Sequence, residues 1–159
     1  MFSSLMHVAF YTEHFDEMMD FYTNKLGLPV KVLTRFSSYR DSSDRPAMQK
    51  AALENPDRIF NAYIELAPGQ FIELFPERKG QVRHEAPDGS EFGYAHFALT
   101  TEDIYQTRQE LEARGVVFDT GISKGPSGTY QMWTHDPDGN RFEIMQYTEE
   151  SYQVTGHID

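Results

Sequence analysis

An internal repeat is the feature of this sequence that most restricts its fold. Residues 7–13 read HVAFYTE and residues 96–102 read HFALTTE, with His, Ala, Thr and Glu at the same offsets. Residues 68–75 read PGQFIELF and residues 138–145 read DGNRFEIM, and in each a Gly precedes a Glu that lies between apolar neighbours. Each half therefore opens with His and closes with Glu, and the repeat predicts two copies of one structural unit.

One amphipathic helix is predicted in each half. The first helix ends at Gly27 and has an apolar face formed by Phe15, Met18, Met19, Tyr22 and Leu26. The second helix follows Asp103, a favourable N-cap, and ends at Gly115. Its apolar face includes Ile104 and Leu111, so both helices are expected to pack one side against a core.

Short β-branched and aromatic segments bounded by Gly, Pro and Asp predict the strands. They are LMHVAFY, NAYIELA and QFIELFP in the first half, and YAHFALT, YQMWTHD and RFEIMQY in the second. A strand, a helix and further strands thus follow one another twice. This order predicts an α+β protein made of two βαβββ modules.

The predicted modules span residues 1–79 and 94–148. A polar, turn-rich linker at 80–93 joins them, and a C-terminal tail at 149–159 has no periodic pattern. The first module is the longer one, because it contains an insertion at about 36–60.

The insertion contains a predicted short helix of its own. Pro46 stands in the first turn of this helix, and Asn55-Pro56 ends it. Two interpretations stay open for the segment: a lid that shapes the pocket, or a surface loop.

Composition argues against several classes of function. The chain has 159 residues, no cysteine and a formal net charge of -11 at pH 7. The negative charge repels nucleic acid and anionic membrane surfaces, so we expect neither as a partner. The sequence has no basic leader and no apolar stretch long enough for a membrane span, so a cytoplasmic location is expected. Without cysteine, imidazole and carboxylate groups would have to bind any metal.

The repeated His and Glu residues predict a metal site. A carboxylate between apolar strand neighbours is costly to bury unless it is paired, protonated or metal-bound, and this cost arises once in each half. A lone residue of this kind would more simply be hydrogen-bonded or solvated. Two matched pairs instead favour one divalent ion, Ni, Zn, Co, Mn or Fe, with the ligands His7, Glu73, His96 and Glu143.

The other four histidines do not share this pattern, and surface positions are expected for them. They are His14, His84, His135 and His157.

In these segments the sequence resembles the vicinal oxygen chelate superfamily, which includes glyoxalase I, extradiol dioxygenases and bleomycin-resistance proteins. The resemblance covers residues 5–147. It implies that the two modules form a cupped, incompletely closed mixed β-barrel with the metal inside, commonly in a homodimer.

Within that superfamily, glyoxalase I is the most similar, because its ligands follow the order His, Glu, His, Glu. The resemblance implies a lyase that isomerises the thiol adduct of a 2-oxoaldehyde, a small-molecule substrate whose oxygens the metal holds. It also implies that Glu143 or Glu73 is catalytic and moves a proton between adjacent carbons.

Two positions depart from glyoxalase I. Those enzymes typically carry Arg four residues after the first His and Asn four residues after the first Glu, and this chain has Tyr11 and Glu77 there. Losing a cation and gaining an anion weakens the binding of a glutathione carboxylate. These positions therefore disfavour glutathione as the thiol.

Two alternative functions remain open from the sequence. One is an extradiol-type dioxygenase that uses Fe(II) or Mn(II) and three of the four ligands. The other is a metal-free protein of the resistance type that binds a drug-like molecule. Oxygen uptake with catechols would indicate the first, and absence of bound metal would indicate the second.

Overall fold

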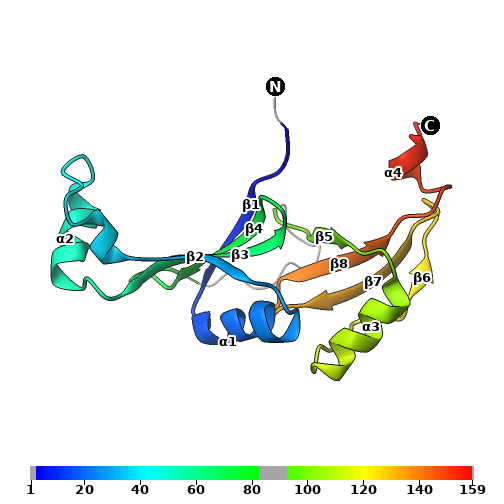
Figure 1. Ribbon diagram of the computed structural model, residues 1–159, viewed down its shortest axis with the longest axis horizontal. Coiled ribbons are helices and arrows are strands. Elements are labelled where there is room, and N and C mark those ends of the chain that lie inside the picture. The colour runs from blue at the N-terminus through cyan, green and yellow to red at the C-terminus, as the bar shows by residue number, and fades with distance from the viewer. Residues whose placement is uncertain (1–2, 83–92, 159) are drawn as a thin grey trace. The chain divides into compact units, whose positions relative to one another are not determined.

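The structure is a computed structural model that describes residues 3–82 and 93–158. The chain divides into two compact units, Met1–Val82 and Arg83–Asp159. Each unit contains one four-stranded mixed sheet (Figure 1). The predicted α+β class with two βαβββ modules is confirmed, and within the described residues neither sheet closes into a barrel. Most of the predicted linker at 80–93 lies outside the described residues.

The first unit contains β1 (His7–Thr12), α1 (Phe15–Asp20), the π-helix η1 (Phe21–Lys25), β2 (Val30–Arg35), the 3-10 helix η2 (Phe36–Tyr39), α2 (Pro46–Glu54), β3 (Ile59–Ala67) and β4 (Gln70–Pro76). Its strands lie in the order β1-β4-β3-β2. Strands β1 and β4 pair in parallel, and the other neighbours are antiparallel. The parallel pair results from the crossover that carries the chain from β1 through the helices to the rest of the sheet.

The second unit contains β5 (Phe97–Thr100), α3 (Ile104–Ala113), β6 (Ser123–Lys124), β7 (Tyr130–His135), β8 (Arg141–Gln146) and α4 (Tyr152–Thr155). Its order β5-β8-β7-β6 repeats the first sheet, with the first strand again parallel to the last. The internal repeat of the sequence is thus a repeat of topology.

The helices begin and end for local reasons. Asp103 caps α3, because its carboxylate accepts hydrogen bonds from the backbone N–H groups of Tyr105 and Gln106. Gly27 and Gly115 follow the two main helices with φ of 75° and 81°, a backbone conformation that favours glycine. Helix α2 lies where the sequence predicts one and has proline in its first turn.

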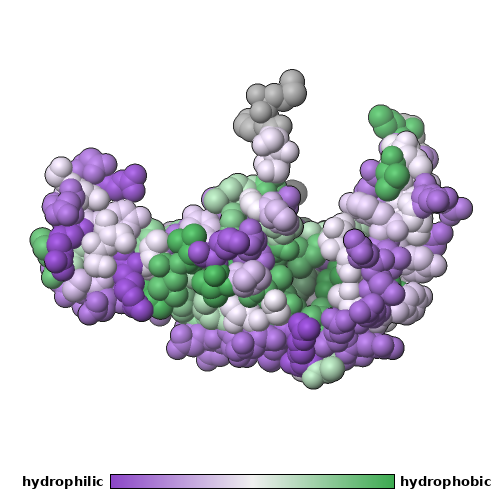
Figure 2. Space-filling view, viewed as in Figure 1, coloured by the Kyte–Doolittle hydropathy of each residue, from purple (hydrophilic) through white to green (hydrophobic). Residues whose placement is uncertain are grey.

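One face of each sheet packs against a helix and forms the core. Helix α1 contacts β4 in the first unit, and α3 contacts β8 in the second (Figure 1). The fully buried apolar residues are Met18, Tyr22, Ala52, Ala62, Ile64, Ile72 and Leu74 in the first unit, and Ile104, Met132 and Phe142 in the second. Figure 2 shows that the outer sides of α1 and α3 are hydrophilic, as expected for amphipathic helices. Because side chains alternate along a strand, Glu73 and Glu143 point to the face away from the helix.

Two strands escaped the sequence-based prediction. Strand β2 lies at a sheet edge and is mostly exposed, so it lacks the buried alternation that marks a half-buried strand. Strand β6 is only Ser123–Lys124, too short to show any period. No helix in the described part of the chain is long and apolar enough to cross a membrane.

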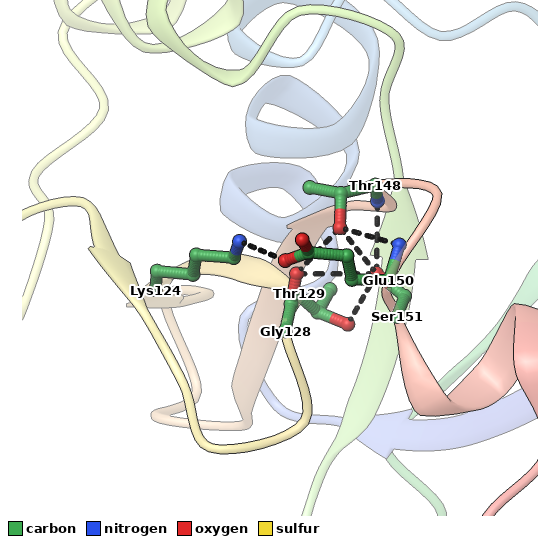
Figure 3. A network of polar contacts seen from close by, with 6 residues as sticks. All are labelled: Lys124, Gly128, Thr129, Thr148, Glu150 and Ser151. Atoms are coloured by element: carbon green, nitrogen blue, oxygen red, sulfur yellow. Dashed lines mark hydrogen bonds and ion pairs between the residues drawn. The ribbon is translucent and has the colours of Figure 1, made fainter.

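The C-terminal tail packs against the second unit through Ser151, whose side chain is fully buried (Figure 3). The hydroxyl of Ser151 accepts hydrogen bonds from the Thr129 hydroxyl at 2.9 Å and from the Thr148 backbone N–H at 2.8 Å. Lys124 and Glu150 add an ion pair at 3.0 Å. The tail therefore has fixed polar contacts although its sequence shows no periodicity.

Candidate metal centre

The first half of the candidate site is built around Glu73 in β4. Glu73 is 5% exposed, and its register neighbours are Ala9 on β1 and Tyr63 on β3. His7, the first residue of β1, places its Nε2 atom 3.3 Å from Oε2 of Glu73. The structure therefore brings together the His and Glu that the sequence predicts for this half.

Polar neighbours on β3 hold Glu73. The Asn61 side-chain amide donates to Glu73 Oε1 at 2.6 Å, and the Thr34 hydroxyl donates to the Asn61 oxygen. Burial and a hydrogen bond to Glu73 raise the pKa of Tyr63 to about 12, so its hydroxyl stays protonated and donates to the carboxylate.

Sequence reasoning did not single out Asn61 or Tyr63. Both lie in the predicted strand NAYIELA, two residues apart and so on one face. Asparagine in an otherwise apolar strand was the available signal, because a buried amide requires a hydrogen-bonding partner.

The second half of the candidate site repeats the same backbone geometry around Glu143 in β8. Glu143 is 6% exposed, and its register neighbours are Ala98 on β5 and Trp133 on β7. His96 directly precedes β5, and its Nε2 atom lies 3.9 Å from Oε2 of Glu143. The His96 ring meets Trp133 edge-on with ring centroids 4.7 Å apart. The predicted pair is again brought together.

The two carboxylates differ in their surroundings. Among the described residues, no side chain or backbone group donates a hydrogen bond to Glu143, and burial raises its pKa, although the charges of His96 and Arg141 oppose that shift. The Arg141 guanidinium lies over the Trp133 ring, 4.2 Å from the centroid. Glu73 is thus held by donors, whereas no described group donates a hydrogen bond to Glu143, whose side chain is 8% exposed.

The donor set fits a divalent ion of intermediate softness. Each unit supplies one imidazole nitrogen and one carboxylate oxygen, the ligands that Zn, Ni, Co, Mn and Fe accept. Two donors that each lie about 2.1 Å from one ion can be at most about 4.2 Å apart, and the pair distances of 3.3 Å and 3.9 Å are below that limit. Within the described residues, no group of three or more His, Asp or Glu side chains forms a metal site. Binding of one ion by all four residues stays a prediction.

The remaining histidines contribute nothing to these pairs in the described residues. His135 is half exposed and pairs with Asp119 at 2.8 Å. His157 stacks on Tyr152 with centroids 3.9 Å apart. His84 lies outside the described residues.

Comparison with known proteins agrees with this architecture. The family model described as "Glyoxalase/Bleomycin resistance protein/Dioxygenase superfamily" matches residues 4–144, nearly the whole chain. The chain belongs to this superfamily.

Curated relatives within the superfamily are lactoylglutathione lyases. One from Arabidopsis thaliana is 25% identical over 145 residues, which are 89% of this chain and 43% of the relative. A putative lactoylglutathione lyase from Brassica oleracea is 26% identical with the same coverage. This chain therefore spans less than half the length of these relatives.

Solved structures of the superfamily share the fold. A glyoxalase family protein from Enterococcus faecalis has a TM-score of 0.66 at 21% identity, covering 91% of this chain and 98% of that one. A lactoylglutathione lyase from Agrobacterium tumefaciens has a TM-score of 0.57 at 19% identity, covering 91% and 93%. At these identities the likeness concerns the fold alone.

Proposed function

We propose that this protein is a metal-dependent, glyoxalase I-like lyase that isomerises the thiol adduct of a 2-oxoaldehyde by proton transfer next to a carbonyl. The observation that carries the proposal is the repeated His–Glu pair. Both carboxylates are nearly buried and occupy the same register position in their sheets, each with an imidazole within 4 Å. The names of the curated relatives support the same reaction.

The proposed ligands are His7, Glu73, His96 and Glu143. A divalent ion bound there would act as a Lewis acid that polarises the substrate carbonyl and lowers the pKa of the adjacent carbon. Nitrogen and oxygen ligands leave the choice among Ni, Zn, Co, Mn and Fe open.

The surroundings of the two carboxylates suggest different roles for them. Asn61 and Tyr63 both donate to Glu73, and these bonds hold it in one position. Glu143 has no such donor among the described residues, so fewer contacts hold its carboxylate in one position. We therefore assign the proton transfer to Glu143 and assign Glu73 to a fixed position beside the metal.

The deciding experiment compares metal content and isomerase activity in the wild type, His96→Ala and His135→Ala. The protein is purified without an affinity tag and assayed with the methylglyoxal adducts of several thiols. We expect stoichiometric metal in the wild type and loss of both metal and activity in His96→Ala. The matched control is His135→Ala. It also removes an imidazole that pairs with a carboxylate, but this imidazole belongs to neither proposed ligand pair. We expect His135→Ala to keep both its metal and its activity. Loss of metal with unchanged activity would overturn the proposal.

The same protein tests the two alternative functions. Oxygen uptake with catechols would indicate an extradiol-type dioxygenase, and absence of metal even after metal addition would indicate a binding protein of the resistance type. Association into a homodimer and a cytoplasmic location are also proposals. Light scattering of the purified protein tests the former.

A further inference from the structure

Arg78 lies just after β4, and aromatic rings surround its guanidinium group. The guanidinium carbon is 4.9 Å from the ring centroid of Tyr11, 5.4 Å from that of Phe75 and 5.7 Å from that of Phe60. The side chain is half-buried. Because aromatic faces attract cations, these three rings hold the charged group in place.

In the part of the chain that the structure describes, no acidic side chain accounts for this arrangement. Among the described residues, Arg78 forms no ion pair, and its guanidinium N–H groups donate to no protein acceptor. Arg108, by contrast, also lies over a ring, that of Phe118 at 4.7 Å, but it pairs with Glu112 at 2.9 Å. Stacking on rings leaves the in-plane N–H donors of a guanidinium open, and their fork matches the two oxygens of a carboxylate.

The ring of Phe75 links Arg78 to β4, the strand that carries Glu73. Tyr11 and Phe75 are register partners on β1 and β4. Side chains alternate between the two faces of β4, so Phe75, two residues after Glu73, lies on the same face as Glu73. Two residues of strand correspond to roughly 6.6 Å, and the Arg78 guanidinium carbon lies a further 5.4 Å from the Phe75 ring centroid.

We propose that Arg78 binds a carboxylate group of the substrate and thereby determines its specificity. This inference rests on the proposed function, because it concerns the substrate of the same site. It selects a thiol that carries a carboxylate a few bonds from sulfur. The Tyr11 ring holds Arg78 in position and does not itself bind the carboxylate. The rings of Phe75 and Phe60 complete the enclosure.

The first test measures binding without requiring catalysis. Wild-type protein is titrated with (methylthio)acetate and with (methylthio)ethanol, and resonance shifts are followed by NMR. These probes have similar length and differ in charge. We expect wild-type protein to bind the carboxylate probe more tightly than the neutral probe. In Arg78→Gln the ratio of the two affinities should fall by about 10-fold to 100-fold, because charge-assisted hydrogen bonds to the carboxylate are lost. Equal affinity of both probes for the wild type would overturn the role of Arg78.

The second test measures turnover of the methylglyoxal adducts of mercaptoacetate and mercaptoethanol. In Arg78→Gln we expect KM to rise for the charged adduct only, with the neutral adduct unaffected. Arg78→Lys keeps the charge but loses the fork, so it should lie between the wild type and Arg78→Gln. If Arg78→Gln fails to fold, Arg78→Lys takes its place in this comparison.

Arg108→Gln is the matched control, since it removes a stacked arginine from the second unit, and it should behave as the wild type with both adducts. An equal rise in KM for both adducts in Arg78→Gln would overturn the proposal. If the wild type turns over neither adduct, the proposed reaction is wrong, while the NMR titration still decides whether Arg78 binds a carboxylate.

Discussion

Glu73 and Glu143 show how two residues at equivalent backbone positions acquire different chemistry from their neighbours. Both are nearly buried and both face an imidazole. The difference comes from two positions on the neighbouring strand. Asn61 and Tyr63 donate to Glu73, whereas their equivalents Gln131 and Trp133 donate nothing to Glu143 within the described residues. A buried carboxylate with donors is held in place, and one without donors is poised to bind a proton or a metal.

Replacing Asn61 with alanine tests the support of Glu73. The buried carboxylate loses one of its two donors, so we expect the free energy of unfolding to fall by about 1–3 kcal/mol. Metal affinity should fall by about 10-fold to 100-fold, because residues that orient ligands typically have effects of this size. Urea unfolding and metal titration measure the two effects.

Gln131→Ala serves as the control for Asn61→Ala, since it truncates the equivalent residue of the second unit. We expect it to leave metal affinity unchanged. Equal losses in both variants would show that Asn61 does not act through Glu73.

Glu143 makes the stability of the metal-free protein depend on pH. Burial raises the pKa of Glu143 above its ordinary value of 4.5, so the folded protein binds this proton more tightly than the unfolded chain does. Stability therefore falls as the pH rises from the ordinary to the raised value, and the penalty is fully present above the raised value. Glu143→Gln removes the charge, so at neutral pH it should unfold at higher urea concentration than the wild type.

The stability that Glu143→Gln gains over the wild type should vanish well below pH 4.5, where the wild-type carboxyl is protonated in both the folded and the unfolded state. Urea midpoints across the pH range, without metal, measure the effect. Glu149→Gln removes a charge from an exposed residue and should show no comparable gain. A gain of the same size at low pH would contradict this account.

At the scale of elements, each half uses one strand pair to position its ligands. The parallel pairing of first and last strands places Ala9 opposite Glu73 and Ala98 opposite Glu143. Each His lies two residues before that Ala, so the same offset brings His to Glu in both sheets. A register slip of one residue would turn each carboxylate into the core, where the helix packs.

Helix α3 supports the second of these sheets, and its N-cap can be tested directly. Asp103→Ala removes the acceptor for the backbone N–H groups of Tyr105 and Gln106. We expect a loss of about 0.5–2 kcal/mol in the free energy of unfolding. Asp103→Asn keeps a capping oxygen and should retain most of the stability. Thermal unfolding of both variants measures the difference.

At the scale of the whole molecule, each unit contributes half of the proposed ligand set. The first unit holds the His7–Glu73 pair and the second holds the His96–Glu143 pair. Two ligands bind a divalent ion weakly, and four bind it tightly, so the proposed site requires both halves of the chain.

Metal addition should therefore stabilise the folded protein. At a free metal concentration of 100 times Kd, the free energy of unfolding should rise by about 2.7 kcal/mol. Thermal unfolding with and without a chelator measures the rise. If one ion uses all four ligands, His7→Ala and His96→Ala should each reduce this stabilisation strongly. A variant of one unit that keeps the full effect would contradict a shared site.

The sequence by itself determined the repeat, the two main helices with their caps, the six principal strands and the two His–Glu pairs. These features depend on local periodicity, on turn residues and on the matching of the two halves, all of which are visible along the chain. Strands β2 and β6 were missed because an exposed edge strand and a two-residue strand carry no such pattern.

Only the tertiary structure decided what surrounds each carboxylate. Asn61 and Tyr63 meet Glu73 because β3 pairs with β4 in one register, and Arg78 meets Tyr11 because β1 lies beside β4. Hydrogen bonds, burial and cation–π contacts between strands depend on distances between residues far apart in sequence, which periodicity does not encode. The candidate metal ligands could therefore be predicted from the sequence. The different surroundings of the two glutamates, and the aromatic enclosure of Arg78, depend on strand pairing.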